Sequence, residues 1–270
     1  MTTANTVPAA QDLLVEQRDG VVWLTLNRPE AVNSVTPGMV SAINAELDQI
    51  ATDQTVRCIV FTGAGGAFCS GSHLAIVAGE NNDQHEKRLD QFIASINSLL
   101  NRIAALPLPA IAAINGTALG AGLELALVCD FIVASADARI GDGHARFGLL
   151  PGGGASARLP RRIGVAAAKW LSFTGELFPA QELMACGLVQ RVYPAAQFTN
   201  EVNRLANLIA KRSPLGLRRV KALIENALAA PIEDALANEQ RELRLHRSSL
   251  DRAEGLAAFA EKREPRFQGM

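Results

Sequence analysis

The chain has 270 residues, of which 49% are hydrophobic and 20% are charged, a composition typical of a globular enzyme with one large domain. Its formal net charge of −1 supplies no basic surface for nucleic acid or for an anionic membrane, so we expect neither as a partner. The sequence shows no CxxC pair, no metal-ligand spacing, no secretory signal and no apolar segment of bilayer length, which predicts a metal-free cytoplasmic protein.

Short apolar runs alternate with amphipathic helical patterns along the first 199 residues. A hairpin is expected from residues 13–17 and 21–27, and Thr36 followed by Pro37 is typical of a helix start. Each strand runs into a glycine-rich turn, so the pattern predicts a repeated strand–turn–helix unit with one shared core. Further strands are expected at residues 58–63, 110–114, 131–134, 139–141 and 188–193, and further helices over residues 89–103 and after residues 120 and 154.

The composition changes near residue 200, where the chain becomes helical and more strongly charged. Pro214 and Pro231 interrupt this part of the chain. We therefore divide the chain into a core at residues 1–199 and a C-terminal helical region at residues 200–270. We expect the second region to pack on the core or on a partner.

Residues 115–130 (NGTALGAGLELALVCD) carry the strongest chemical signal. Small residues end a buried strand and open an apolar helix, whose free N–H groups can hold an oxyanion. Glu124 stands in the first turn as a potential acid or base. A capping box is the structural alternative, but it needs Ser or Thr three residues earlier, and Ala121 has no side-chain oxygen.

Several motifs, in this order, resemble those of the enoyl-CoA hydratase/isomerase (crotonase) family. The resemblance runs from about Val22 to Phe267, nearly the whole chain. Each motif is weak alone, and their order and spacing carry the assignment. Besides residues 115–130, they are residues 27–34 (NRPEAVNS), 67–74 (AFCSGSHL), 151–154 (PGGG), 158–160 (RLP), 171–175 (LSFTG), 185–189 (ACGLV) and 259–263 (FAEKR).

The resemblance implies an α/β fold, a crotonase-like spiral of ββα units followed by a C-terminal α-helical trimerisation region. It implies a homotrimer or a dimer of trimers. It also implies an acyl-CoA thioester as substrate, with no cofactor besides the CoA that the substrate carries.

The resemblance also assigns site residues. The backbone N–H groups of Ser72 and Ala121 would form an oxyanion hole for the thioester oxygen, beside Glu124 as the catalytic carboxylate. Ala121 replaces a glycine that is common there, which a backbone donor should tolerate. Substrate-binding residues are implied at Ala31, Val32, Gly71, His73, Leu74, Gly120, Pro151, Gly152, Phe259 and Lys262, the last two within reach of CoA from the same or a neighbouring subunit.

The chain departs from the hydratases of this family at their second glutamate. Counting back from Pro151, that position is His144. A histidine can serve as an acid or a base near neutral pH, so His144 is the second candidate catalytic residue, although it could instead be a structural histidine bonded to backbone. Asp142 is a weaker candidate, and its place before Gly143 favours the interpretation as a turn residue.

Three functions remain open from the sequence. The first is a lyase of the hydratase class that reversibly hydrates a 2-enoyl-CoA through an enolate. The second is an enoyl-CoA isomerase, or a hydrolase of carbon–carbon bonds that uses His144. The third is a non-catalytic acyl-CoA binder. We expect the acyl pocket to involve residues 75–100, and the sequence does not identify the acyl group.

Overall fold

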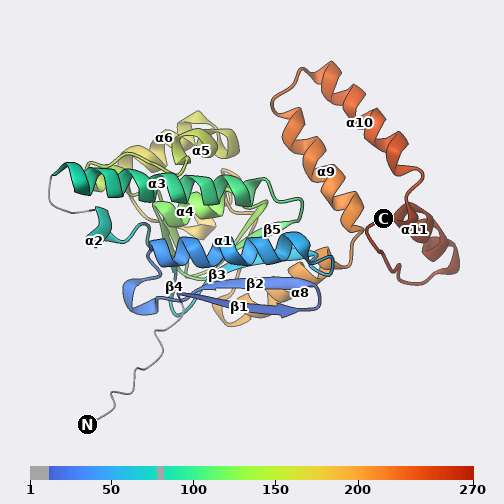
Figure 1. Cartoon of the computed structure of the whole chain (residues 1–270), viewed down its shortest axis with the longest axis horizontal. Helices are drawn as coiled ribbons and strands as arrows, with labels where there is room; N and C mark the ends of the chain where they lie inside the picture. The colour runs from blue at the N-terminus through green and yellow to red at the C-terminus, as the bar shows by residue number, and fades with distance from the viewer. Residues whose placement is uncertain (1–11, 78–81) are drawn as a thin grey trace, which may run out of the picture.

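The computed structural model describes residues 12–77 and 82–270. A six-stranded sheet, ordered β1-β2-β3-β5-β7-β10, forms its centre (Figure 1). β1 and β2 pair as the expected antiparallel hairpin, and the other neighbours are parallel. The strands are β1 (Leu13–Arg18), β2 (Val21–Leu26), β3 (Cys58–Gly63), β5 (Ala110–Ile114), β7 (Phe131–Ser135) and β10 (Arg191–Tyr193).

Helices cover both faces of this sheet, because its side chains alternate between two hydrophobic cores. Leu24 and Phe61 pack with residues of α1 (Pro37–Thr52) and α3 (Asp83–Ala104). Trp23 and Val60 pack with residues of α8 (Phe198–Ala210). The predicted start of α1 is confirmed, since the Thr36 hydroxyl accepts a hydrogen bond from the Met39 amide at 3.1 Å.

A second, four-stranded sheet, ordered β4-β6-β8-β9, was not fully anticipated. The glycine-rich segments expected as turns after the strands at residues 58–63 and 110–114 contain β4 and β6. Each predicted unit is therefore a strand of the large sheet, a short strand of the small sheet and then helical structure, which is the implied ββα repeat. The short strands are β4 (Ala67–Cys69), β6 (Thr117–Leu119), β8 (Arg139–Gly141) and β9 (Phe178–Pro179).

Short helices connect the strands and complete the core. Buried thiols at Cys58, Cys69 and Cys129 belong to this core, and burial raises the pKa of each to about 12. The connecting elements are η1 (Pro29–Ala31), α2 (Leu74–Val77), α4 (Ala121–Leu127), η2 (His144–Phe147), α5 (Ala155–Ile163), α6 (Val165–Thr174), α7 (Ala180–Leu183) and η3 (Ala195–Gln197).

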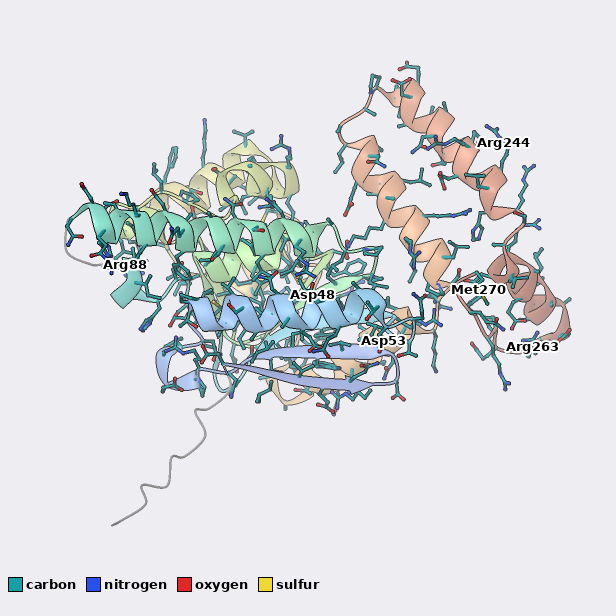
Figure 2. The ribbon with its side chains drawn as sticks, in the orientation of Figure 1. Asp48, Asp53, Arg88, Arg244, Arg263 and Met270 are labelled. Atoms are coloured by element: carbon teal, nitrogen blue, oxygen red, sulfur yellow. The ribbon has the colours of Figure 1, made fainter. Side chains whose placement is uncertain are left out.

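Three C-terminal helices, α9 (Pro214–Ala227), α10 (Ile232–His246) and α11 (Leu250–Glu261), project away from the sheets (Figure 1). Lys221 of α9 ties them to the body by donating to the Leu108 carbonyl and pairing with Asp130 at 3.0 Å. Figure 2 shows the side chains of α10 and α11 standing free of the body, with Arg244 on α10 and Arg263 just after the end of α11. No helix within the described residues is both long enough and apolar enough to cross a membrane.

Candidate active site

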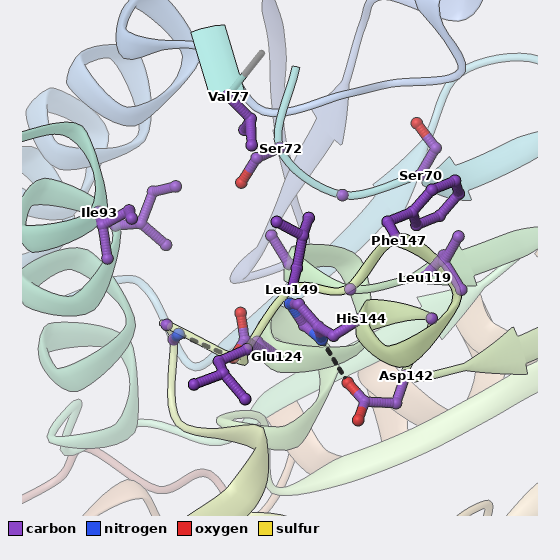
Figure 3. Close-up of a pocket in the computed structure, with 18 of the residues that line it drawn as sticks. Ser70, Ser72, Val77, Ile93, Leu119, Glu124, Asp142, His144, Phe147 and Leu149 are labelled. Carbon is purple, nitrogen blue, oxygen red and sulfur yellow. Dashed lines mark hydrogen bonds and ion pairs between the residues drawn. The ribbon is translucent and has the colours of Figure 1, made fainter. Parts of the chain in front are cut away.

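Three loops converge at one edge of the small sheet. They follow β4, β6 and β8, which are mutually parallel, so their carboxyl ends lie at the same edge. Ser72, Ala121 and His144 stand two or three residues beyond these strand ends. A pocket of about 190 Å³ is lined by residues of all three loops and by Glu124 (Figure 3).

Two backbone amides come from neighbouring segments of the pocket wall. Ser72 pairs with Val35 as a parallel bridge, in which the amide of His73, and not that of Ser72, donates to the Val35 carbonyl. Ala121 is the first residue of α4, so its amide has no acceptor within the helix. A methyl group on Gly71 (φ +106°) would lie 3.6 Å from the Ala121 nitrogen, so the two segments are in contact.

Glu124 projects into the pocket from α4 and is only 3% exposed. Its Oε1 accepts hydrogen bonds from the amides of Gly153 at 2.7 Å and Ala155 at 3.2 Å. Any side chain at Gly153 would meet the carboxylate, because a Cβ there would lie 2.5 Å from Oε2. Burial raises the pKa of Glu124, and the two amides and the charge of His144 oppose burial without cancelling it.

His144 and Asp142 form a hydrogen-bonded pair in the pocket wall near Glu124, with 2.5 Å between Nδ1 and Oδ1 (Figure 3). Burial alone would lower the pKa of His144, but the hydrogen bond and charge of Asp142 and the charge of Glu124 outweigh burial, so this pKa is raised. Burial acts to raise the pKa of Asp142, but its bonds to His144 and Ser172 prevail and hold that pKa low. Asp142 therefore favours the protonated form of His144 through Nδ1, and Nε2 takes no part in this pair.

The interpretation of Asp142 as a turn residue was wrong. Asp142 is 2% exposed, and its carboxylate is turned inward to His144. The sequence contained one signal, an acid two residues before a candidate catalytic histidine, but an acid beside a glycine is far more often a turn former. Burial, which distinguishes the two, depends on β8 and α6 packing around this loop.

The remaining pocket wall is apolar. Leu89, Phe92, Ile93 and Ile96 line it from α3 at helical spacing, so the structure places this part of residues 75–100 at the pocket as expected. Phe147, Leu149 and Leu150 complete the wall from η2 and the loop after it.

Comparisons with known proteins identify the family of this chain. A family model described as enoyl-CoA hydratase/isomerase matches residues 16–270. The chain belongs to the enoyl-CoA hydratase/isomerase family. The predictions of the family, of the mixed α/β fold and of a lyase of the hydratase class are thereby confirmed.

Relatives and solved structures of the family cover nearly the whole chain. Methylglutaconyl-CoA hydratase of Rattus norvegicus is 36% identical over 95% of this chain and 82% of its own length. The 2,3-dehydroadipyl-CoA hydratase of Escherichia coli is 36% identical over 96% of this chain and 99% of its own. The structure of enoyl-CoA hydratase from Bacillus anthracis superposes with a TM-score of 0.91 at 36% identity, covering 96% of this chain and 100% of that one.

The implied CoA-path residues fall into three groups in this member of the family. Gly71, Gly120 and Gly152 line the pocket directly, and Pro151 lies between two lining residues. The other groups lie outside the pocket lining.

The second group lies beside the pocket. Ala31 ends η1, and the Val32 carbonyl accepts the amide of Ser70, which lines the pocket. His73 lies 3.1 Å from the Ser34 hydroxyl through Nδ1. Leu74 begins α2, and its side chain is outside the described part of the structure.

The third group lies far from the pocket of the same chain. Phe259 is on α11 and Lys262 directly follows that helix, at the end of the molecule opposite α2 and the free end of α3 (Figure 1). Of the two routes to CoA left open by the sequence, contact from a neighbouring subunit is the one compatible with this placement.

Proposed function

We propose that this protein reversibly hydrates a 2-enoyl-CoA thioester, with Glu124 and His144 as its acid–base pair. The observation that carries the proposal is that both side chains line one pocket together with Ser72 and Ala121. The hydratases among its relatives support the reaction class. The site's own acid, base and amide donors provide the chemistry, so the proposal includes no cofactor beyond the CoA of the substrate.

The proposed reaction begins with water held by Glu124. The carboxylate takes a proton from this water as its oxygen bonds to the β-carbon, and electrons move to the thioester oxygen. The amides of Ser72 and Ala121 stabilise that oxygen, a contribution typically worth about 3 kcal/mol for each donor. Nε2 of His144 then gives its proton to the α-carbon, so one water has been added across the double bond.

The proposed working state pairs an ionised Glu124 with a protonated His144. After one turnover the carboxyl holds a proton and the imidazole has lost one, so transfer of a proton between them, directly or through solvent, restores the enzyme. A pair of glutamates could supply one base and one acid only if one of the two carboxyl groups were kept neutral. Here Asp142 keeps His144 charged, and the opposite charges of the pair stabilise each other.

We expect a bell-shaped dependence of kcat on pH, whose alkaline limb Asp142 controls. Activity should fall as pH rises through the pKa of His144, because the acid is lost, and as pH falls through the raised pKa of Glu124, because the base is lost. In Asp142→Asn the negative charge is gone, so the pKa of His144 should drop and the alkaline limb should move to lower pH. Steady-state rates with crotonyl-CoA across pH measure this.

The asparagine variant removes the charge of Asp142 but keeps the orientation of His144, since its Oδ1 can still accept a hydrogen bond from Nδ1 of His144. The KM for crotonyl-CoA should therefore remain near that of the parent. An alkaline limb at the same pH in both proteins would contradict the proposed coupling. Asp137→Asn, at an exposed turn, is the matched control and should leave the profile unchanged.

A product assay tests the reaction itself against the alternatives from the sequence. Mass spectrometry after incubation with crotonyl-CoA should show the mass of one added water. With 3-enoyl-CoA, isomerisation would leave the mass unchanged, and a carbon–carbon hydrolase would release two smaller products from a β-diketone. Tight binding without any turnover would identify a non-catalytic binder and would defeat the proposal.

We also propose that copies of this chain assemble through their C-terminal helices, as the trimer implied by the family resemblance. Apolar side chains on these helices are exposed in the single chain, including Ile224 (61%), Leu228 (83%) and Phe259 (85%). Exposed apolar surface of this kind marks an interaction site. A neighbouring copy would bring Phe259 and Lys262 to a CoA site that they cannot reach within their own chain.

An acidic substitution on α9 tests the assembly. Ile224→Asp should shift the mass measured by light scattering from trimer towards monomer, because a carboxylate would be buried at the interface without a partner. Circular dichroism should be unchanged, since the side chain is exposed in the single chain. Gln240→Asp, at an exposed polar position of α10, should leave the trimer intact, and a monomeric parent protein would refute the proposal.

A further inference from the structure

The acyl pocket contains no positive charge apart from the reacting histidine. Its ionisable lining groups, in the described part of the chain, are Glu124, Asp142 and His144. His144 already pairs with Asp142, and its remaining nitrogen faces the reacting carbons in the proposed mechanism. Away from these three residues the described lining consists of backbone at small residues, the hydroxyls of Ser70 and Ser72, and apolar side chains, most of them from α3, η2 and the loop that follows η2.

Two neighbouring cations, Arg158 and Arg88, lie outside the pocket lining. Arg158 donates to the Gly153 carbonyl at 2.7 Å and to Asn101 at 2.6 Å. Arg88 lies near the start of α3 (Figure 2) and lines a different groove, together with His85. Residues 1–11 and 78–81, which the structure does not describe, contain neither lysine nor arginine in the sequence.

We propose that this pocket selects an enoyl-CoA with a neutral hydrocarbon acyl chain and rejects one whose chain ends in a carboxylate. The inference rests on the proposed hydration. A distal carboxylate would lose water against Phe92 and Ile96, and the uncharged hydroxyls of Ser70 and Ser72 are the only side-chain donors besides His144 in the described lining. It would also be repelled by the two carboxylates at the other end of the pocket.

Two substrates of equal chain length provide the test. Hex-2-enoyl-CoA and 2,3-dehydroadipyl-CoA, the thioester named for the Escherichia coli relative, differ only in a terminal methyl group or carboxylate. We expect kcat/KM for hydration to be at least about 100-fold higher with hex-2-enoyl-CoA, because unpaired burial of a charge is penalised more heavily than an added hydroxyl. Equal rates, or a preference for the carboxylate, would overturn the inference and leave the hydratase function intact.

A lysine placed in the wall should reverse part of this selectivity. Ile93 lines the pocket yet is 37% exposed, so Ile93→Lys can keep its ammonium group hydrated in the free enzyme. The ratio of kcat/KM values should move at least about tenfold towards 2,3-dehydroadipyl-CoA. Ser98→Lys adds the same charge on the exposed face of α3 and should not change the ratio.

The outcomes distinguish the proposed hydratase function from the proposed selectivity for a neutral acyl chain. Hydration of neither substrate would defeat the proposed function, and the selectivity with it. A strong preference for hex-2-enoyl-CoA that Ile93→Lys weakens and Ser98→Lys preserves supports both. A ratio that Ile93→Lys leaves unchanged would show that charge in this wall does not set the selectivity, and the inference would then be wrong.

Discussion

Replacing Glu124 by glutamine should lower kcat for crotonyl-CoA hydration by about a thousandfold. General acid–base catalysis by one positioned group contributes about 10²–10⁴ in rate, and Glu124 is the carboxylate that touches water in the proposed mechanism. Glutamine has the same shape, and its Oε1 can still accept the amides of Gly153 and Ala155. The fold and the KM should therefore be preserved while the base is lost.

Stopped assays of kcat and KM measure this loss, and thermal unfolding checks the fold. Glu86→Gln, at an exposed position near the start of α3, is the matched control and should keep the parental rate. If Glu124→Gln hydrated crotonyl-CoA at the parental rate, Glu124 would have no part in the chemistry, and the buried carboxylate would be structural.

Removing the imidazole in His144→Ala should lower kcat by about a hundredfold and abolish the alkaline limb of the pH profile. The oxyanion donors and Glu124 remain, so a slower reaction in which solvent protonates the α-carbon should persist. Added imidazole should restore part of the rate, because the truncation opens space beside Asp142 where the free base can bind.

Rescue by imidazole is specific to this position. The Glu124→Gln variant keeps its side-chain volume and lacks a carboxylate, not an imidazole. Added imidazole should therefore not raise its rate. Unchanged kcat in His144→Ala would instead show that this residue supports the loop structurally, which is the alternative that the sequence left open.

Much of the fold was predictable because its elements carry strong local patterns. β3 and β5 are continuous apolar runs, and α1 begins with the expected Thr36 and Pro37. β4 and β6 were missed because they are short and lie within glycine-rich stretches that were interpreted as turns, and their stability comes from pairing with each other and with β8. The start of α3 was expected near Leu89, but the helix begins at Asp83, where Asn82 caps it with a bond to the His85 amide.

The candidate site was likewise predicted only in part. Glu124 was identified from its place in a helix-start motif and His144 from the family resemblance, and the structure brings them to one pocket. The groups that determine their protonation were not identified as such. The amide of Gly153 lies 29 residues from Glu124 in the chain, and nothing local marks it as a hydrogen-bond donor to that carboxylate.

The sequence by itself determined which residues can act as acid, base and amide donor, because those properties belong to the covalent structure and to short motifs such as residues 115–130. Only the tertiary structure decided their charge states and surroundings. Burial of Glu124 arises when separate turns of the spiral pack together, the hydrogen bond between Asp142 and His144 forms within one loop that this packing buries, and α3 supplies much of the apolar wall of the pocket by lying across the loops. Electrostatic free energies depend on distance and on solvent exclusion, and neither is a property of neighbouring residues in a chain.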